Sequence, residues 1–292
     1  MMENSSRSLE IFQTACKSYA TKKCYTYWLD RYMKHTGAKT YDELLLGNPE
    51  NIQVKLEDYL LELKQKNFKR SAIDGIFSSL ELFYLMNHVK TLNFKLIRKL
   101  FPEQEKIDKV PYTTEHIKQM LELSEDLQTS ALVHFLAASG ARIGAIDTLK
   151  IENLTAFKDT KSILVYAETK DEYTTFLTPE ASQVLDSYLE NRKTGRVFGF
   201  TYPNARMILY KLRKKADIEG DKIPIAHGFR MRWDTIFKNM NGINTNLIEK
   251  MMGHSVKLDD SYHKPTIERL FQEYEKGIPE LTIFRVDEIR NE

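Results

Sequence analysis

The stretch ALVHFLAASGARIG, residues 131–144, contains an apolar helix, the glycine that ends it and an arginine just beyond. Residues 131–138 are apolar and predict a helix. Gly140 ends that helix, because glycine readily adopts the left-handed conformation found at helix C-termini. Arg142 then stands at the start of a further helix, just past the glycine. Its guanidinium places a permanent positive charge at that point.

Two short β-prone runs follow at residues 162–168 (SILVYAE) and 173–177 (YTTFL). A tight polar turn that contains Lys170 joins them, which predicts a β-hairpin. Thr178 and Pro179 then form a favourable N-cap and first helical residue, so another helix is expected after the hairpin. The second half of the chain is therefore predicted to be mainly helical, with a small β-hairpin or sheet.

The first hundred residues predict helices and no strand. The helices are expected to open at Thr21, at Asn48-Pro49 and at Ser71, and Gly37 stops the first of them. Each has an apolar stripe at helical spacing that predicts a core face. The stripes are Cys24, Trp28 and Tyr32 in the first helix, Val54 and Leu61 in the second, and Ile73, Ile76, Phe77, Leu80 and Phe83 in the third.

Residues 102–111 (PEQEKIDKVP) are charged, poor in apolar groups and bounded by prolines. That composition is typical of a linker. We therefore expect a helical domain over residues 1–103, a linker over 104–112 and a second domain over 113–292.

The net charge of +2 neither requires nor excludes nucleic acid, because clustering of charge on one face matters more. Two basic clusters occur, one before the third helix and one in a helix that Pro203 opens. Each is either a solvated helix face or a surface that meets DNA phosphates. The DNA-binding candidates are Lys64, Lys66, Lys69, Arg70, Arg206, Lys211, Arg213 and Lys214.

Cys16 and Cys24 fit no zinc pattern, which favours free thiols in a reducing compartment. The sequence shows neither a signal peptide nor a membrane span, so a cytoplasmic protein is expected. Asp259 and Asp260 are adjacent, so their carboxylates diverge on a helix and no metal site is predicted. Trp233 is expected in the core and not as a base-stacking platform.

Five short signals occur in one order in the second domain. They are Arg142 in SGARIG, Lys170 in the hairpin turn, His227 and Arg230 in HGFR, His254 in GHS, and Tyr262. Each signal alone has an ordinary structural explanation, such as a helix cap, a turn lysine or a packed tyrosine. Their order within one domain of suitable size is the observation that points to chemistry.

That chemistry is metal-free cleavage of a DNA strand. Arg142 and Arg230 would clamp the scissile phosphate, since guanidiniums stabilise charge on phosphoryl oxygens. Tyr262 would attack the phosphorus, and His227 would accept its proton. The departing 5′-oxygen needs a proton donor, for which Lys170 is the candidate. A phosphotyrosine bond keeps the phosphodiester energy, which explains the lack of a nucleotide-binding motif.

The order of these residues resembles the tyrosine recombinase (phage integrase) family. The segments AASGARIGAIDTLK (137–150), AHGFRMRWDT (226–235) and MMGHSVKLDDSYHKP (251–265) are similar to its three signature boxes, and the chain looks closest to integrases of archaeal viruses and proviruses. The resemblance implies a helical core-binding domain followed by a catalytic domain of the DNA breaking–rejoining fold. It also implies that His254 hydrogen-bonds the phosphate.

The chain departs from the family pattern in three places. Ala145 stands where the family often has an acidic residue, although Asp147 is nearby. The interval from histidine to tyrosine is one residue shorter than the commonest version. The hairpin turn is short, which leaves Lys158 and Lys161 as alternatives to Lys170.

The resemblance implies that double-stranded DNA is the substrate and that four protomers act on two sites. A monomer is expected without DNA, and no cofactor. Residues 281–286 (LTIFRV) would pack either on a neighbouring protomer or on their own chain. Two alternatives stay open: an enzyme like type IB topoisomerases, and a DNA-binding relative without catalysis.

Overall fold

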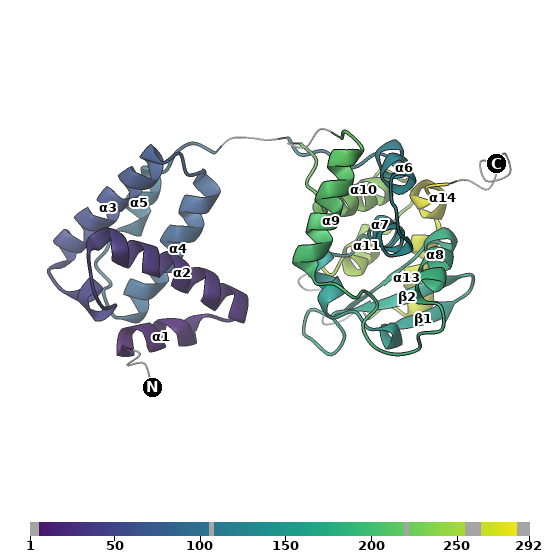
Figure 1. Cartoon of the computed structure of the whole chain (residues 1–292). Helices are drawn as coiled ribbons and strands as arrows, with labels where there is room; N and C mark the ends of the chain where they lie inside the picture. Colours follow the sequence, from purple (N-terminus) through teal and green to yellow (C-terminus); the bar gives the residue numbers. More distant parts are fainter. Residues whose placement is uncertain (1–5, 105–107, 219–221, 255–263, 285–292) are drawn as a thin grey trace. The chain divides into compact units, whose positions relative to one another are not determined.

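The computed structural model describes residues 6–104, 108–218, 222–254 and 264–284 (Figure 1). The chain divides into two compact units, Met1–Lys106 and Ile107–Glu292. The described part of each unit has its own apolar core.

The first unit is built from helices, and α4 lies at its centre. α4 contacts α1, α2 and α5, and all five apolar residues predicted for its inner face are buried. No strand occurs in the described part of this unit. The helices are α1 (Arg7–Ala15), α2 (Tyr19–Thr36), α3 (Pro49–Gln65), α4 (Arg70–Met86) and α5 (Phe94–Lys99), with a 3₁₀ turn η1 (Asp42–Leu45).

Two details of these helices differ from the sequence prediction. Ser18, not Thr21, caps α2, because its hydroxyl accepts the backbone N–H of Thr21 at 3.1 Å. Cys24, which was predicted on the core face, is exposed. In α3 the expected inward residues Val54 and Leu61 are about half exposed. Helical periodicity places a longer stripe inward, namely Ile52, Leu56, Tyr59, Leu60 and Leu63.

The second unit surrounds α7 (Leu127–Ser139), of which nearly every residue is buried. α7 packs against α8 and α10, and the N-cap of α8 is Thr178, as predicted. The other elements are α6 (Thr114–Glu122), η2 (Ile143–Asp147), η3 (Ile151–Asn153), α8 (Pro179–Leu189), α9 (Tyr202–Lys215), α10 (His227–Lys238), α11 (Thr245–Met251), α13 (Ile267–Glu275) and α14 (Ile278–Leu281).

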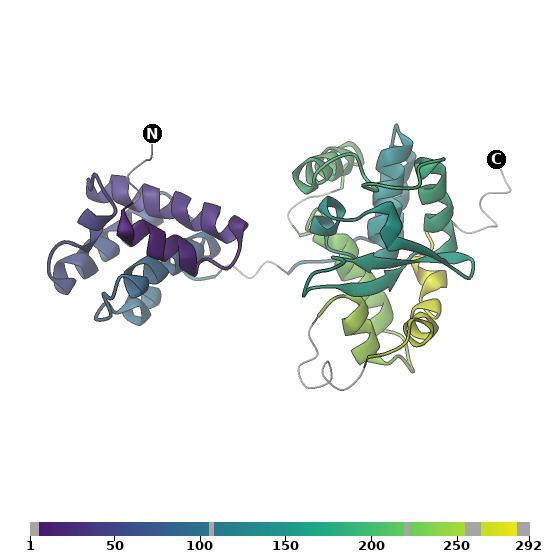
Figure 2. The ribbon, with the colours of Figure 1, turned by 90° about the horizontal axis from the view of Figure 1, so that it is seen from below.

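A three-stranded antiparallel sheet crosses this unit in the order β1-β2-β3. The strands are β1 (Leu154–Phe157), β2 (Thr160–Val165) and β3 (Tyr173–Phe176). α8 contacts β2 and α13 contacts β3, and Figure 2 shows the sheet between these helices. The predicted hairpin of β2 and β3 is confirmed, as is the mainly helical fold. β1 was not predicted, because its four residues are a short run in which the two central side chains are exposed and only the outer two are partly buried.

The end of the described chain packs on its own unit. Leu281 and Ile283 are buried, and the backbone N–H groups of Ile283 and Phe284 donate to the Glu180 carboxylate at 2.8 and 2.9 Å. Residues 281–284 therefore lie in cis, while the rest of the predicted packing segment falls outside the described residues. None of the helices in the described ranges has the length and apolar character of a membrane span.

Candidate active site

The end of α7 is locked to α10 by close packing. Gly140 has a φ of +60°, and a Cβ atom there would lie 2.7 Å from the ring of Trp233. The Trp233 Nε1–H donates to the Ala138 carbonyl at 2.9 Å, which confirms that this tryptophan belongs to the core. This packing sets the position of the segment that begins at Arg142.

Arg230 ties three segments together at one point. Its guanidinium is buried and donates to the carbonyls of Gly140, at 2.8 Å, and Met252, at 2.5 Å. Arg142 is exposed, and its Nη1 lies 3.5 Å from the carbonyls of Met252 and Gly253. Both guanidiniums thus meet the end of α11. Burial, followed by the charge of Arg142, lowers the pKa of Arg230.

Gly253 allows His254 to reach this point. Its φ is +64°, and a Cβ atom would lie 2.4 Å from the ring of Tyr173, so only glycine fits. The His254 Nε2 then lies 2.8 Å from the Arg230 Nη2. On the other side of the ring, Nδ1 lies 2.5 Å from the Glu249 carboxylate.

His227 is the first residue of α10 and is exposed. Desolvation lowers its pKa most, and the positive charges of Arg230, Lys109 and Arg142 lower it further. The imidazole is therefore neutral at pH 7 and can accept a proton. The structure thus gathers Arg142, His227, Arg230 and His254 from separate segments into one electropositive site.

Two tyrosines that the sequence did not indicate line the same site. The rings of Tyr166 and Tyr173 lie 6.2 Å apart. A Cβ atom on Gly144 would lie 3.4 Å from the Tyr166 hydroxyl. Desolvation raises the pKa of both tyrosines, while Arg142 and Arg230 oppose that rise. Both flank the hairpin turn, and that position was the available signal.

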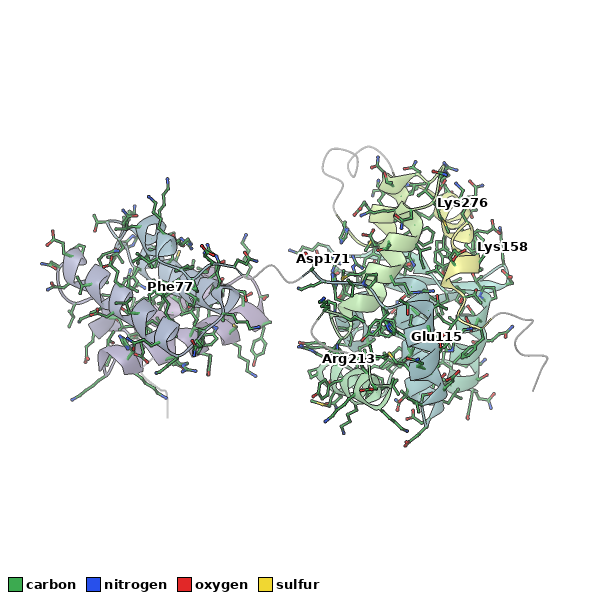
Figure 3. The ribbon with its side chains drawn as sticks, turned by 90° about the horizontal axis from the view of Figure 1, so that it is seen from above. Phe77, Glu115, Lys158, Asp171, Arg213 and Lys276 are labelled. Carbon is green, nitrogen blue, oxygen red and sulfur yellow. The ribbon has the colours of Figure 1, made fainter. Side chains whose placement is uncertain are left out.

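Lys170 is exposed in the turn between β2 and β3, at the end of the sheet that carries these tyrosines. The alternatives lie elsewhere. Lys158 sits in the turn between β1 and β2, where it pairs with Glu275 at 3.2 Å. Figure 3 shows Lys158 and Asp171, the neighbour of Lys170, on opposite sides of the unit. Lys161 pairs with Asp186 at 3.0 Å. Lys158 and Lys161 thus have carboxylate partners elsewhere in the unit, and Lys170 stays the candidate from the sequence.

Ala145 stands where the family often has an acidic residue, and the nearby Asp147 does not take that place in the site. Ala145 is buried in the core. The Asp147 carboxylate accepts the backbone N–H of Tyr202 at 2.6 Å and so fastens the start of α9 to η2. Asp147 therefore has a structural partner outside the site.

Tyr262 lies outside the described residues, as do Asp259 and Asp260. Within the described ranges, no three His, Cys, Asp or Glu side chains are grouped so that they could hold a metal ion. The side chains of Arg142, Arg230, His227 and His254 instead present cationic and neutral nitrogen groups, which suit an anion.

The basic clusters divide into exposed and structural residues. Arg206, Lys211 and Lys214 are exposed on α9, and Lys69 is exposed before α4. Arg213 is the exception on α9, because its side chain is only 8% exposed and donates to the Ile223 carbonyl at 2.7 Å (Figure 3). Its burial argues against the expected DNA contact.

In the first unit, the cluster before α4 also has internal partners. Lys64 and Arg70 donate to the carbonyls of Leu100 and Pro102 at 3.0 and 2.9 Å. Lys66 pairs with Glu62. The Lys64 and Arg70 contacts hold the segment after α5, so part of this cluster has a structural role.

Comparison with known proteins gives a consistent result. Residues 112–258 match the model of the Phage integrase family, whereas no curated protein matches the chain. A solved lambda integrase dimer bound to a COC′ core site is 14% identical, with a TM-score of 0.64 and coverage of 89% of this chain and 97% of that chain.

Two further solved structures have the same fold. The Tn1549 transposon integrase in complex with transposon right end DNA is 14% identical, with a TM-score of 0.64, and covers 92% of this chain and 98% of its own. The XerH site-specific recombinase bound to palindromic difH substrate is 15% identical, with a TM-score of 0.52, and the match covers 75% of this chain and 68% of that chain.

Proposed function

The chain belongs to the phage integrase family, and from that we propose that it is a site-specific tyrosine recombinase. It would cleave and rejoin double-stranded DNA through a covalent 3′-phosphotyrosine intermediate. The observation that carries this proposal is the convergence of Arg142, Arg230 and His254 at the end of α11, beside a neutral His227.

The two arginines have different roles in phosphate binding. Arg230 is held by two carbonyls and would keep its place when DNA binds. The contacts of Arg142 with the described residues Met252 and Gly253 are long and its side chain is exposed, so its guanidinium is available to close on a phosphate. Two guanidiniums donate to non-bridging oxygens, whose negative charge grows in the transition state.

The remaining groups would handle protons and the nucleophile. The hydroxyl oxygen of Tyr262 would form the new bond to phosphorus while the bond to the 5′-oxygen breaks. His227 would accept the tyrosine proton, and Lys170 would give a proton to the 5′-oxygen. Religation reverses these steps and consumes no nucleotide, because the phosphotyrosine retains the energy of the broken bond. Neither a metal ion nor another cofactor takes part in this scheme.

The family membership also supports proposals about assembly. The XerH and lambda integrase structures contain DNA, and a related lambda integrase structure is a tetramer on a Holliday junction. We infer that this chain acts as four protomers on two DNA sites. A likeness to archaeal virus integrases stays a prediction from the sequence.

A nicked suicide substrate tests the proposed chemistry, because cleavage then traps the covalent adduct. The wild-type chain should form the adduct and the Tyr262→Phe variant should not. Tyr19→Phe, at an exposed position in the first unit, is the matched control and should react normally. An adduct that persists in Tyr262→Phe would show that another tyrosine is the nucleophile.

The same preparation separates the two alternative functions. A type IB topoisomerase-like enzyme would relax a supercoiled plasmid that has a single site, without recombining two sites. A DNA-binding relative without catalysis would bind the substrate and form no adduct. Recombination between two sites supports the recombinase.

A further inference from the structure

Glu249 lies on α11 between Lys238 of α10 and His254, and its side chain is mostly buried. One carboxylate oxygen is 2.5 Å from the His254 Nδ1. The other is 2.7 Å from the Lys238 ammonium. Both oxygens therefore have a specific partner, although nothing in the sequence singled out this residue.

These contacts determine where the hydrogen of His254 lies. A carboxylate accepts hydrogen bonds, so Nδ1 carries the hydrogen that faces Glu249. The Arg230 guanidinium can only donate, so the Nε2 at 2.8 Å accepts. The ring is thus held in one tautomer and one orientation, with Nε2 directed at the catalytic arginine.

Lys238 connects this carboxylate to the helix that carries Arg230. Arg230, Asp234 and Lys238 follow one another at four-residue intervals on one face of α10. The Lys238 ammonium lies 2.9 Å from Asp234 and 2.7 Å from Glu249. Desolvation raises the pKa of Glu249, but the hydrogen bonds from Lys238 and His254 outweigh it and leave the pKa low. Glu249 is therefore ionised at neutral pH.

We propose that Glu249 is a positioning residue for cleavage. It holds the Nδ1 of His254 so that Nε2 stays beside the Arg230 guanidinium and accepts its hydrogen bond, which orients the arginine that binds the phosphate. The Lys238 contact links this arrangement to α10, so the histidine and the arginine keep their relative positions. The inference rests on the proposed function, and Glu249 itself acts only through His254.

The kinetic test compares Glu249→Ala and Glu249→Gln with the wild-type full chain. Single-turnover adduct formation is measured on the suicide substrate at saturating DNA. Glu249→Ala should react on the order of tenfold more slowly or worse, a loss typical of removing a group that orients a catalytic ligand. Glu249→Gln should recover much of the rate, because its amide oxygen still accepts the Nδ1 hydrogen.

DNA affinity and thermal unfolding separate positioning from a general defect. Both should stay close to wild type in Glu249→Ala. Glu125→Ala is the matched control, since it removes an exposed glutamate that pairs with Lys215 at 2.6 Å outside the site. Its rate should equal that of the wild type. A rate loss in Glu249→Ala that only follows lost DNA binding would overturn the proposal.

A double-mutant cycle with His254→Ala asks whether Glu249 acts through the histidine. The double variant should be no slower than His254→Ala alone. Independent, additive losses would contradict the proposal, as would a wild-type rate in Glu249→Ala.

A measurement without catalysis keeps this inference apart from the proposed function. The ¹⁵N spectrum of the His254 imidazole should report the Nδ1–H tautomer in the wild type and lose that preference in Glu249→Ala. The absence of any adduct in the wild type would end the recombinase proposal. An unchanged imidazole spectrum would instead end the role of Glu249.

Discussion

The site at the end of α11 and the surface of α9 both carry cationic side chains, but these differ in burial. At the end of α11, Arg230 is buried and directed by two backbone carbonyls. On α9, Arg206 and Lys211 are exposed to solvent. A held guanidinium can serve one phosphate at a defined position, whereas solvated cations attract any phosphate nearby. We therefore expect loss of the arginines that meet the end of α11 to lower the rate of cleavage, and loss of the cations on α9 to lower DNA affinity.

The largest expected effect comes from the two site arginines. Arg230→Ala and Arg142→Ala should each slow adduct formation by about 10² to 10³, as for other removed donors to a transition-state oxyanion. Stability should distinguish them. Arg230→Ala leaves the buried carbonyls of Gly140 and Met252 without the hydrogen bonds that Arg230 donates. The free energy of unfolding should therefore fall by about 2 kcal/mol.

Arg142→Ala should change the free energy of unfolding by less than about 0.5 kcal/mol, because the side chain is exposed. Chemical denaturation and single-turnover kinetics measure the two quantities. Equal destabilisation by both variants would contradict the contrast between a held and an available arginine.

The next effect, on stability, is expected from the glycine that brings His254 into the site. Gly253→Ala adds a Cβ atom 2.4 Å from the ring of Tyr173 at a φ of +64°. Backbone strain and overpacking together should lower the free energy of unfolding by about 3 kcal/mol. Gly242→Ala is the control, since its φ is +73° but nothing lies within 4 Å of the added atom.

That control should lose only about 1 kcal/mol, the strain component alone. Denaturant unfolding of both variants gives the comparison. If Gly242→Ala were as unstable as Gly253→Ala, the contact with Tyr173 would have no part in positioning the site.

The smallest effect per residue belongs to α9. Arg206→Ala and Lys211→Ala should each weaken DNA binding a few-fold, to the same extent for different DNA sequences. Each should reduce the slope of log affinity against log salt by about 1. The cleavage rate at saturating DNA should not change. Titrations at several salt concentrations check this, and an unchanged slope would remove α9 from the DNA-binding surface.

The order of short motifs predicted one shared site, and the structure brings four of its predicted residues together, namely Arg142, His227, Arg230 and His254. Their types and spacing are set by chemistry that leaves a mark on the sequence. The partner Glu249 left no such mark, since its role depends on how α10 packs against α11. Tertiary contacts of this kind have no local pattern.

Arg213 shows the same limit from the opposite side. Its place in a basic run predicted an exposed side chain, yet the Ile223 carbonyl accepts its hydrogen bond within the core. The sequence predicted that Val54 and Leu61 point inward in α3, whereas the buried stripe contains Leu56 and Leu60. The presence of a helix was predictable for both α9 and α3. Which face of each helix is buried depends on contacts with residues far along the chain.

The Glu180 carboxylate provides the second unit with a built-in reporter. The amides of Ile283 and Phe284 donate to it, so their hydrogens are protected for as long as the tail stays on its own protomer. Deuterium uptake at these two amides therefore reads out tail release directly. It does so without a label attached to the protein and without any need for the enzyme to turn over.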